Sequence, residues 1–237
     1  MLAGGYTAVL KARDRNEFRD EVVRFTQRLG FDTVSAVTLV EHGIGRSQVI
    51  TVDNTPTAYA DTYLDPKIGR RDPVVRHCKR ESVPIVWDQS TYLGVGAGDL
   101  WEHQASFGYC TGIAMALHLP DGKHFVFGVD RDRPLPDDPD ELQRLVADLQ
   151  LFAVHAQDAA MRILVPPEYQ PERPKLTPRE LEALRWTMEG KTAWEVGAVL
   201  GISERTAVLH INNAMHKLGC VNKHQAVLKA LRLGLIY

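Results

Sequence analysis

The chain has 237 residues, of which 44% are hydrophobic and 24% are charged, and its formal net charge is −2 at pH 7. This composition is apolar enough for a packed core, which excludes a disordered or low-complexity protein. No window approaches eighteen uncharged apolar residues, and residues 1–5 lack the basic and apolar regions of a signal peptide, so we expect no membrane span and a cytoplasmic location. Three scattered cysteines (Cys78, Cys110 and Cys220) argue against a disulfide framework and agree with a reducing compartment.

Residues 1–164 combine helical and strand patterns in mixed order. Helices are predicted at 15–29, at 56–64, from Asp72-Pro73 onward, at 101–107 and at 137–164; strands are predicted at 34–40, 48–52, 112–119 and 124–130, with a short apolar run at 83–87 and a glycine-rich loop at 88–98. The last two strands form a hairpin around Pro120-Asp121-Gly122. Together these elements predict an α/β domain, an α/β/α sandwich whose central, mostly antiparallel sheet carries helices on both faces.

Two of these helices carry an apolar stripe at helical spacing. The stripe of 15–29 consists of Phe18, Val22, Phe25 and Leu29, and that of 137–164 consists of Leu142, Leu145, Leu149, Phe152 and Ala156. We expect the first to be buried. The second fits a dimer surface or intradomain core equally well.

Residues 165–175 are predicted to be a proline-rich linker between a first domain at 1–164 and a second at 176–237. Four prolines in the ten residues from 165 to 174 remove amide donors and disfavour helix, which makes an extended segment. Charge also divides the chain, because residues 172–237 sum to +4 and residues 1–171 to −6. A basic C-terminal segment joined to an acidic N-terminal segment is typical of a protein that contacts phosphate groups with one end only.

The second domain is predicted to be all-α, with four helices at 178–189, 193–200, 204–218 and 223–233. Capping boxes begin the first two, at Thr177–Glu180 and Thr192–Glu195, and Asn222–Gln225 is a looser version. Between the second and third helices, Gly201 can end one helix and Ser203 can cap the next. A short glycine-containing turn between two short helices predicts a helix-turn-helix.

The helix at 204–218 is the candidate recognition helix. Ala207, Ile211, Ala214 and Leu218 share its inward face at spacings of four, three and four residues. The outward face then offers polar donors and small apolar groups, which suit the major groove of DNA, although an ordinary solvated helix would show the same periodicity. The candidate DNA-binding residues are Lys191, Thr192, Ser203, Glu204, Arg205, Val208, Leu209, Asn212, His216 and Lys217.

These segments resemble the LuxR-type helix-turn-helix over some sixty positions. The matching residues are Leu176-Thr177, Arg179-Glu180, Glu182, Leu184, Trp186, Gly190-Lys191-Thr192, Glu195-Val196, Ile202-Ser203-Glu204, Thr206, His210, Lys217-Leu218, Asn222-Lys223, Gln225-Ala226 and Gly234-Leu235-Ile236. Ala207 departs from the valine usual in the family, which is a small change in the core. The resemblance implies a DNA-binding module.

In the first domain, aromatic and acidic residues lie in or beside short elements. From the residue types alone, we would expect Asp72 to cap a helix and the aromatic side chains to fill the core. However, the spacing of Tyr63, Asp72-Pro73, Trp87 and Gly112 resembles the acyl-homoserine lactone-binding domain of LuxR-type quorum-sensing regulators, in the LasR and QscR branch. The candidate ligand-binding residues are Tyr59, Tyr63, Asp72, Val74, Trp87, Trp101, Tyr109, Gly112, Ala114 and Gly128.

The resemblance implies roles for several of these side chains. Asp72 would accept a hydrogen bond from the ligand amide, Tyr63 would donate to the acyl carbonyl, and the tryptophans would shape the lactone end. Tyr59 stands where the family normally has a tryptophan that donates to the lactone carbonyl. Ala114 and Gly128 stand where related receptors often carry serine or threonine. We therefore expect altered polar recognition, with an N-acyl-homoserine lactone as the favoured ligand.

The sequence predicts a ligand-responsive transcription factor rather than an enzyme. It contains no nucleophile elbow, phosphate loop or metal-ligand spacing, so we expect no catalytic residues, metal or cofactor. The expected partners are double-stranded promoter DNA, a small amphiphilic signal molecule and a second copy of the chain, with RNA polymerase as a further candidate and no membrane. Two alternatives stay open: a receptor for a non-lactone molecule, and a ligand-independent DNA-binding dimer.

Overall fold

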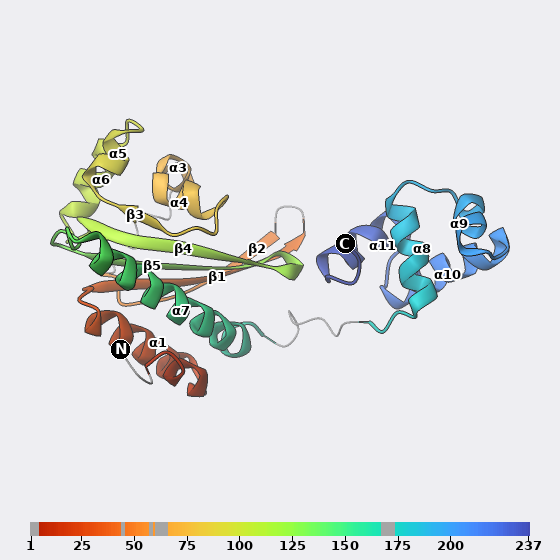
Figure 1. The fold of residues 1–237 in the computed structure, drawn as a ribbon, viewed down its shortest axis with the longest axis horizontal. Coiled ribbons are helices and arrows are strands. Elements are labelled where there is room, and N and C mark those ends of the chain that lie inside the picture. The colour runs from red at the N-terminus through yellow and green to blue at the C-terminus, as the bar shows by residue number, and fades with distance from the viewer. Residues whose placement is uncertain (1–4, 44–45, 57–58, 60–65, 167–173) are drawn as a thin grey trace. The chain divides into compact units, whose positions relative to one another are not determined.

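In the computed structural model, an antiparallel sheet of five strands is the centre of the N-terminal unit (Figure 1). The structure describes the chain except for residues 1–4, 44–45, 57–58, 60–65 and 167–173. The described strands are β1 (Thr33–Gly43), β2 (Arg46–Asp53), β3 (Ile85–Trp87), β4 (Thr111–Leu119) and β5 (Lys123–Arg131). They lie in the order β2-β1-β5-β4-β3, and every neighbouring pair is antiparallel.

Helices cover both faces of this sheet, which confirms the predicted α/β/α sandwich. On one face lie α1 (Arg15–Arg28) and α7 (Pro139–Ile163), after a short 3-10 helix at Ala8–Lys11; on the other lie α3 (Pro66–Arg71), α4 (Pro73–Cys78), α5 (Gln89–Leu93) and α6 (Gly98–Ala105) (Figure 1). None of the described helices has the length and apolar character needed to cross a membrane.

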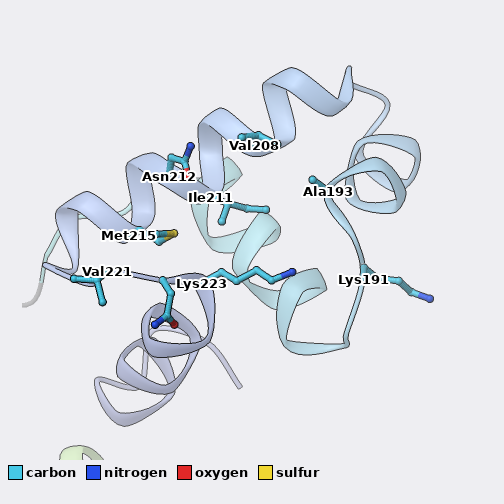
Figure 2. A pocket seen from close by; sticks show the side chains of 9 residues that line it. Lys191, Ala193, Val208, Ile211, Asn212, Met215, Val221 and Lys223 are labelled. Carbon is cyan, nitrogen blue, oxygen red and sulfur yellow. The ribbon is translucent and has the colours of Figure 1, made fainter.

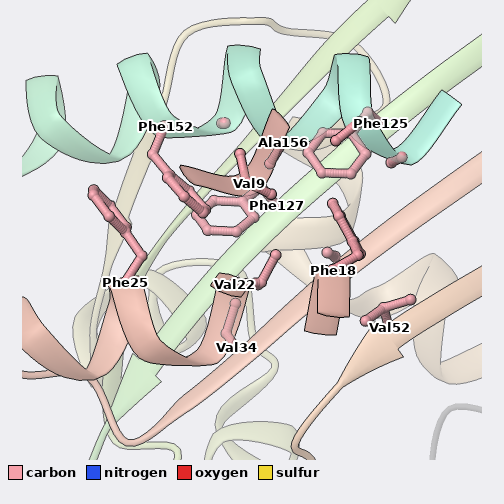
Figure 3. Packing of buried hydrophobic residues seen from close by; sticks show 14 of the residues in the cluster. Val9, Phe18, Val22, Phe25, Val34, Val52, Phe125, Phe127, Phe152 and Ala156 are labelled. Carbon is pink, nitrogen blue, oxygen red and sulfur yellow. The ribbon is translucent and has the colours of Figure 1, made fainter. Parts of the chain in front are cut away.

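The core between the sheet and the pair α1 and α7 is built from the predicted apolar stripes (Figure 3). Phe25 of α1 stacks on Phe152 of α7 with ring centroids 3.9 Å apart. Leu149, Phe152 and Ala156 are each at most 1% exposed, so the stripe of α7 belongs to the intradomain core. Leu29 is only partly buried, because α1 ends one residue before it.

Two predictions about local structure were wrong. The glycine-rich stretch at 88–98 is not all loop, because Asp88 and Thr91 form a reciprocal cap that begins α5, and Tyr92 anchors this helix at 1% exposure. The helix predicted at 101–107 begins earlier, at Gly98. The helix predicted at 56–64 falls mainly outside the described residues.

The C-terminal unit contains the four predicted helices, α8 (Pro178–Met188), α9 (Ala193–Leu200), α10 (Glu204–Lys217) and α11 (Lys223–Arg232). Both predicted capping boxes are present. Gly201 ends α9 in the left-handed conformation at φ 67°, and the Ser203 side chain caps α10. These local signals position α9 and α10 as a helix-turn-helix.

Candidate ligand-binding and DNA-binding sites

Several predicted ligand-binding residues lie on one face of the sheet. Trp87 pairs with Gly112, and two residues along, Ala114 pairs with Gly128. Residues opposite each other on neighbouring strands, and residues two apart on one strand, project from the same face. Since the alternate residues of β4 and β5 belong to the core with α1 and α7, this set faces the α3–α6 layer.

Gly112 is required by the packing of Trp87. A Cβ atom at Gly112 would lie 2.5 Å from the Val129 carbonyl oxygen and 2.7 Å from two atoms of the Trp87 indole. The ring of Trp87 therefore occupies the space that a side chain at Gly112 would fill, and Trp87 is only 4% exposed.

Above this face, Tyr59, Trp87, Tyr92 and Tyr109 form a buried aromatic cluster. Tyr59 stacks on Tyr109 with centroids 4.1 Å apart, and Trp87 meets Tyr92 edge-on at 5.8 Å. Predicted residues Val74 and Trp101 pack against the cluster and are partly buried. The structure thus brings together most of the predicted site, while Tyr63 lies outside the described residues.

Asp72 caps a helix and also faces the aromatic cluster. Its Oδ1 accepts the backbone N–H groups of Val74 and Val75 at 2.8 and 3.0 Å, which begins α4. The Tyr92 hydroxyl lies 3.3 Å from Oδ2 and donates to this carboxylate, which is 2% exposed. Burial and the charge of Asp72 together raise the pKa of Tyr92, which keeps its hydroxyl protonated as a donor.

Gln104 of α6 was missed by the sequence analysis. Its side chain is 3% exposed, and its Oε1 accepts a hydrogen bond of 3.4 Å from the Tyr59 hydroxyl. Its amide Nε2 has no hydrogen-bond partner among the described residues, and neither has the Tyr109 hydroxyl. The indole N–H of Trp101, in contrast, donates to the Cys110 carbonyl at 3.0 Å. Buried glutamine amides have no sequence signal, since Gln104 lies in an otherwise ordinary polar stretch.

Asp130 is a second acidic residue that the sequence analysis missed. It pairs with Gly112 on one side and with Thr33 on the other, so its side chain projects from the same face as Trp87. Part of the residue stays accessible, but burial of the carboxyl raises its pKa to about 8, and the charge of Asp72 adds to this shift. The Thr33 side chain opposes it by hydrogen bonding. The charge of Asp72 therefore favours the protonated form of the Asp130 carboxyl.

The described residues contain no group of three or more His, Cys, Asp or Glu side chains arranged to hold a metal ion. Cys78 packs against Ala114 and Ala116 beside the predicted ligand face. Burial and the charge of Asp72 raise the pKa of its thiol to about 11, so this thiol is protonated and unreactive at neutral pH.

The outward face of α10 is exposed as predicted. The inward residues Ala207, Ile211, Ala214 and Leu218 are at most 6% exposed. Of the predicted DNA-binding residues, Lys191 is partly buried and the other nine are exposed: Thr192, Ser203, Glu204, Arg205, Val208, Leu209, Asn212, His216 and Lys217.

Three of these residues line a depression of about 370 Å³, namely Lys191, Val208 and Asn212 (Figure 2). The wall opposite α10 is formed by the start of α11, where the exposed Lys223 follows the helix cap Asn222. Lys223 was not among the predicted DNA-binding residues. Its position at a helix N-terminus, where amide groups and a cation favour anions, makes it a further candidate.

Lys217 already has a partner within the domain. Its Nζ lies 2.8 Å from both carboxylate oxygens of Glu180, the buried residue of the first capping box. Burial opposes ionisation of Glu180, but the hydrogen bonds from Lys217 and Thr177 lower the pKa of this carboxyl overall. Any phosphate contact by Lys217 would compete with this ion pair.

Comparison with known proteins identifies the family. The profile described as "Autoinducer binding domain" matches residues 14–160, and that described as "Bacterial regulatory proteins, luxR family" matches residues 174–230. The first match alone spans more than half of the chain. The chain belongs to the LuxR family of quorum-sensing transcriptional regulators.

Relatives in this family match along the whole chain. The transcriptional activator protein SolR of Ralstonia nicotianae is 33% identical over 231 residues, which cover 98% of this chain and 97% of SolR. RpaR of Rhodopseudomonas palustris, an HTH-type quorum sensing-dependent transcriptional regulator, is 32% identical over 210 residues, covering 87% of this chain and 83% of RpaR. The structure of SdiA in complex with octanoyl-rac-glycerol matches with a TM-score of 0.71 at 28% identity, covering 97% of this chain and 92% of SdiA. The LuxR family comprises transcriptional regulators and not enzymes, and the two profiles correspond to an autoinducer-binding domain and a DNA-binding helix-turn-helix domain.

Proposed function

We propose that this LuxR-family regulator binds an N-acyl-homoserine lactone in the cytoplasm and reads a palindromic promoter site as a homodimer. The ligand would lie in the domain at 1–164, and the linker at 165–175 would join it to the DNA-binding domain at 176–237. The observation that carries the proposal is the joint burial of Tyr59, Asp72, Trp87 and Tyr109 beside a sheet face of small residues. Polar groups among aromatic walls suit an amphiphile with a polar head.

The chemistry of the ligand amide supports a central role for Asp72. An amide N–H that is buried without an acceptor costs about 1–3 kcal/mol. A carboxylate is a strong acceptor, because a charge-assisted hydrogen bond is roughly twice as strong as a neutral one. The backbone groups that Asp72 caps fix its position, so the carboxylate is held in place before a ligand arrives.

A thermal-shift series with N-acyl-homoserine lactones of increasing chain length tests the ligand assignment. We expect at least one lactone to raise the melting temperature of the full chain, because a ligand that binds the folded state stabilises it. Asp72→Asn should reduce this shift, since the amide can still cap α4 but loses the charge. Asp138→Asn is the matched control, because Asp138 caps α7 away from the aromatic cluster. No stabilisation of the wild type by any chain length would refute the lactone.

Selection of binding sites from random double-stranded DNA tests the second half of the proposal. A homodimer should enrich two inverted half-sites about one helical turn apart, because two symmetry-related recognition helices enter successive major grooves. Enrichment of a single half-site, with one chain bound per duplex, would contradict the dimer. The same experiment without ligand tests the alternative of a ligand-independent DNA-binding dimer, which would enrich the palindrome equally well.

A non-lactone ligand is the second candidate, favoured by the polar groups Tyr59, Gln104 and Asp130 in the candidate site. SdiA, which shares this fold, is known in complex with octanoyl-rac-glycerol. Monoacylglycerols of matched chain length therefore belong in the same thermal-shift series. Stabilisation by the glycerol compounds and not by the lactones would favour this candidate.

A further inference from the structure

Gln104 offers a hydrogen-bond donor that the described part of the protein leaves unused. Its Nε2 is buried and has no partner there, whereas its Oε1 accepts from the Tyr59 hydroxyl. Burial raises the pKa of the nearby Tyr92 hydroxyl, and hydrogen bonding from the Gln104 side chain opposes part of this rise, although no hydrogen bond of ordinary geometry joins the two groups. Gln104 thus lies between two tyrosines of the aromatic cluster.

An orphaned amide donor at this depth is costly. A buried polar group without a partner costs about 1–3 kcal/mol, and native proteins satisfy the great majority of such groups. A ligand oxygen would remove that cost. The neighbouring donors are already engaged in part, because Trp101 donates to Cys110 and Tyr92 donates to Asp72.

We propose that Gln104 is the head-group donor of the ligand site, with its Nε2 donating to the lactone carbonyl. Tyr59 is then a positioning residue, because its hydroxyl donates to Oε1 and so leaves the Nε2 donor for the ligand. This inference rests on the proposed lactone function, in which Asp72 accepts the hydrogen bond of the ligand amide N–H. The lactone carbonyl is an acceptor that a carboxylate cannot pair with, so it needs a separate donor.

The orientation of the amide follows from the tyrosine. A phenol hydroxyl near the oxygen of an amide donates to it, so the two N–H groups must find acceptors elsewhere. The Tyr109 ring stacks on the Tyr59 ring, which restricts movement of the Tyr59 side chain. Substitution of Tyr59 should therefore weaken recognition of the head group, although the Tyr59 hydroxyl does not itself contact the ligand.

A comparison of two ligands distinguishes a Gln104 that donates a hydrogen bond to the ligand from a Gln104 that only supports the fold. One is an N-acyl-homoserine lactone that stabilises the wild type, and the other is the N-acyl cyclopentylamide of equal chain length, which keeps the amide but lacks the ring carbonyl. Calorimetry on the full chain should show that the wild type prefers the lactone about tenfold, a typical effect of one buried hydrogen bond. Gln104→Met, which preserves the side-chain length and removes the donor, should reduce this preference to within about twofold.

Tyr59→Phe should give an intermediate preference, and Gln157→Met, on α7 across the sheet, should leave it at the wild-type value. A structural effect would weaken both ligands equally and leave their ratio unchanged, so an unchanged ratio in Gln104→Met overturns the proposal. Equal binding of both ligands by the wild type overturns it as well, whether or not the variants fold. If the wild type binds neither ligand, the lactone function itself is wrong, which is a different outcome from equal binding.

Discussion

The Asp130→Asn substitution tests whether the second carboxyl group on the ligand face controls the pH dependence of stability. Asp130 projects from β5 beside Gly112 and Thr33, and burial with the charge of Asp72 raises its pKa from 3.8 to about 8. Burial raises the pKa of the Tyr92 and Tyr109 hydroxyls, and the nearby Asp130 carboxyl adds a smaller contribution to both shifts. Asparagine keeps the shape of the side chain and removes the titration.

The sign of the effect follows from proton binding. Between pH 3.8 and about 8 the folded state holds the Asp130 proton and the unfolded state does not. The stability that this group contributes is therefore complete below about pH 4 and is lost as pH rises through 8. Each pH unit within that window corresponds to at most about 1.4 kcal/mol.

Urea unfolding of wild type and Asp130→Asn at pH 5.5, 6.5 and 7.5, without ligand, measures this loss. We expect the difference in unfolding free energy between the two proteins to shift in favour of Asp130→Asn by about 1–2.5 kcal/mol across the series, within the limit of about 2.7 kcal/mol that the slope sets over two pH units. Asp138→Asn, at an exposed helix cap, should show no such trend. A difference between wild type and Asp130→Asn that does not change with pH would refute the assignment of a protonated carboxyl.

Three further substitutions test packing and DNA recognition. Asn212→Ala should relax base preference at one or two positions, at about 1–3 kcal/mol per lost bidentate contact; equal weakening on every sequence in a competition assay would instead make Asn212 a phosphate contact. Gly112→Ala should destabilise the N-terminal unit by about 1–3 kcal/mol, since its Cβ would overlap Trp87, and an unchanged melting temperature would contradict the packing. Gly197→Ala should weaken DNA binding while ligand binding is retained, because its Cβ would lie 2.9 Å from the Ile202 carbonyl oxygen in the helix-turn-helix. DNA binding at wild-type strength would show that the turn can relax.

The C-terminal unit was predictable because its signals are local. Thr177, Thr192 and Ser203 each cap the helix that follows them, and Gly201 takes the one backbone conformation that its place requires. Such signals act within a few residues, so they can be read without knowledge of the tertiary structure. The apolar stripe of α10 was also predictable, because one side of this helix is buried and the other side is exposed.

The candidate ligand face was predictable only in part. The family resemblance predicted Trp87, Gly112 and Asp72 as site residues, but it did not predict Gln104 or Asp130. The environment of Gln104 is set by Tyr59, forty-five residues earlier in the chain, and helical periodicity does not predict that contact. Asp130 alternates with apolar residues on its strand, which normally marks a solvent-facing side chain, yet in this sheet helices cover both faces.

This contrast has a consequence for regulation. The helix-turn-helix unit caps the starts of its helices with its own side chains, whereas the candidate ligand face leaves the buried Gln104 Nε2 without a hydrogen-bond partner of ordinary geometry among the described residues. At about 1–3 kcal/mol, such a group costs a noticeable share of the 5–15 kcal/mol that stabilises a typical domain. A ligand that pairs with Gln104 would stabilise the N-terminal unit by removing this cost. Ligand binding should therefore act on DNA binding through the folding and assembly of the N-terminal unit, because the DNA-binding unit does not need the ligand to be complete.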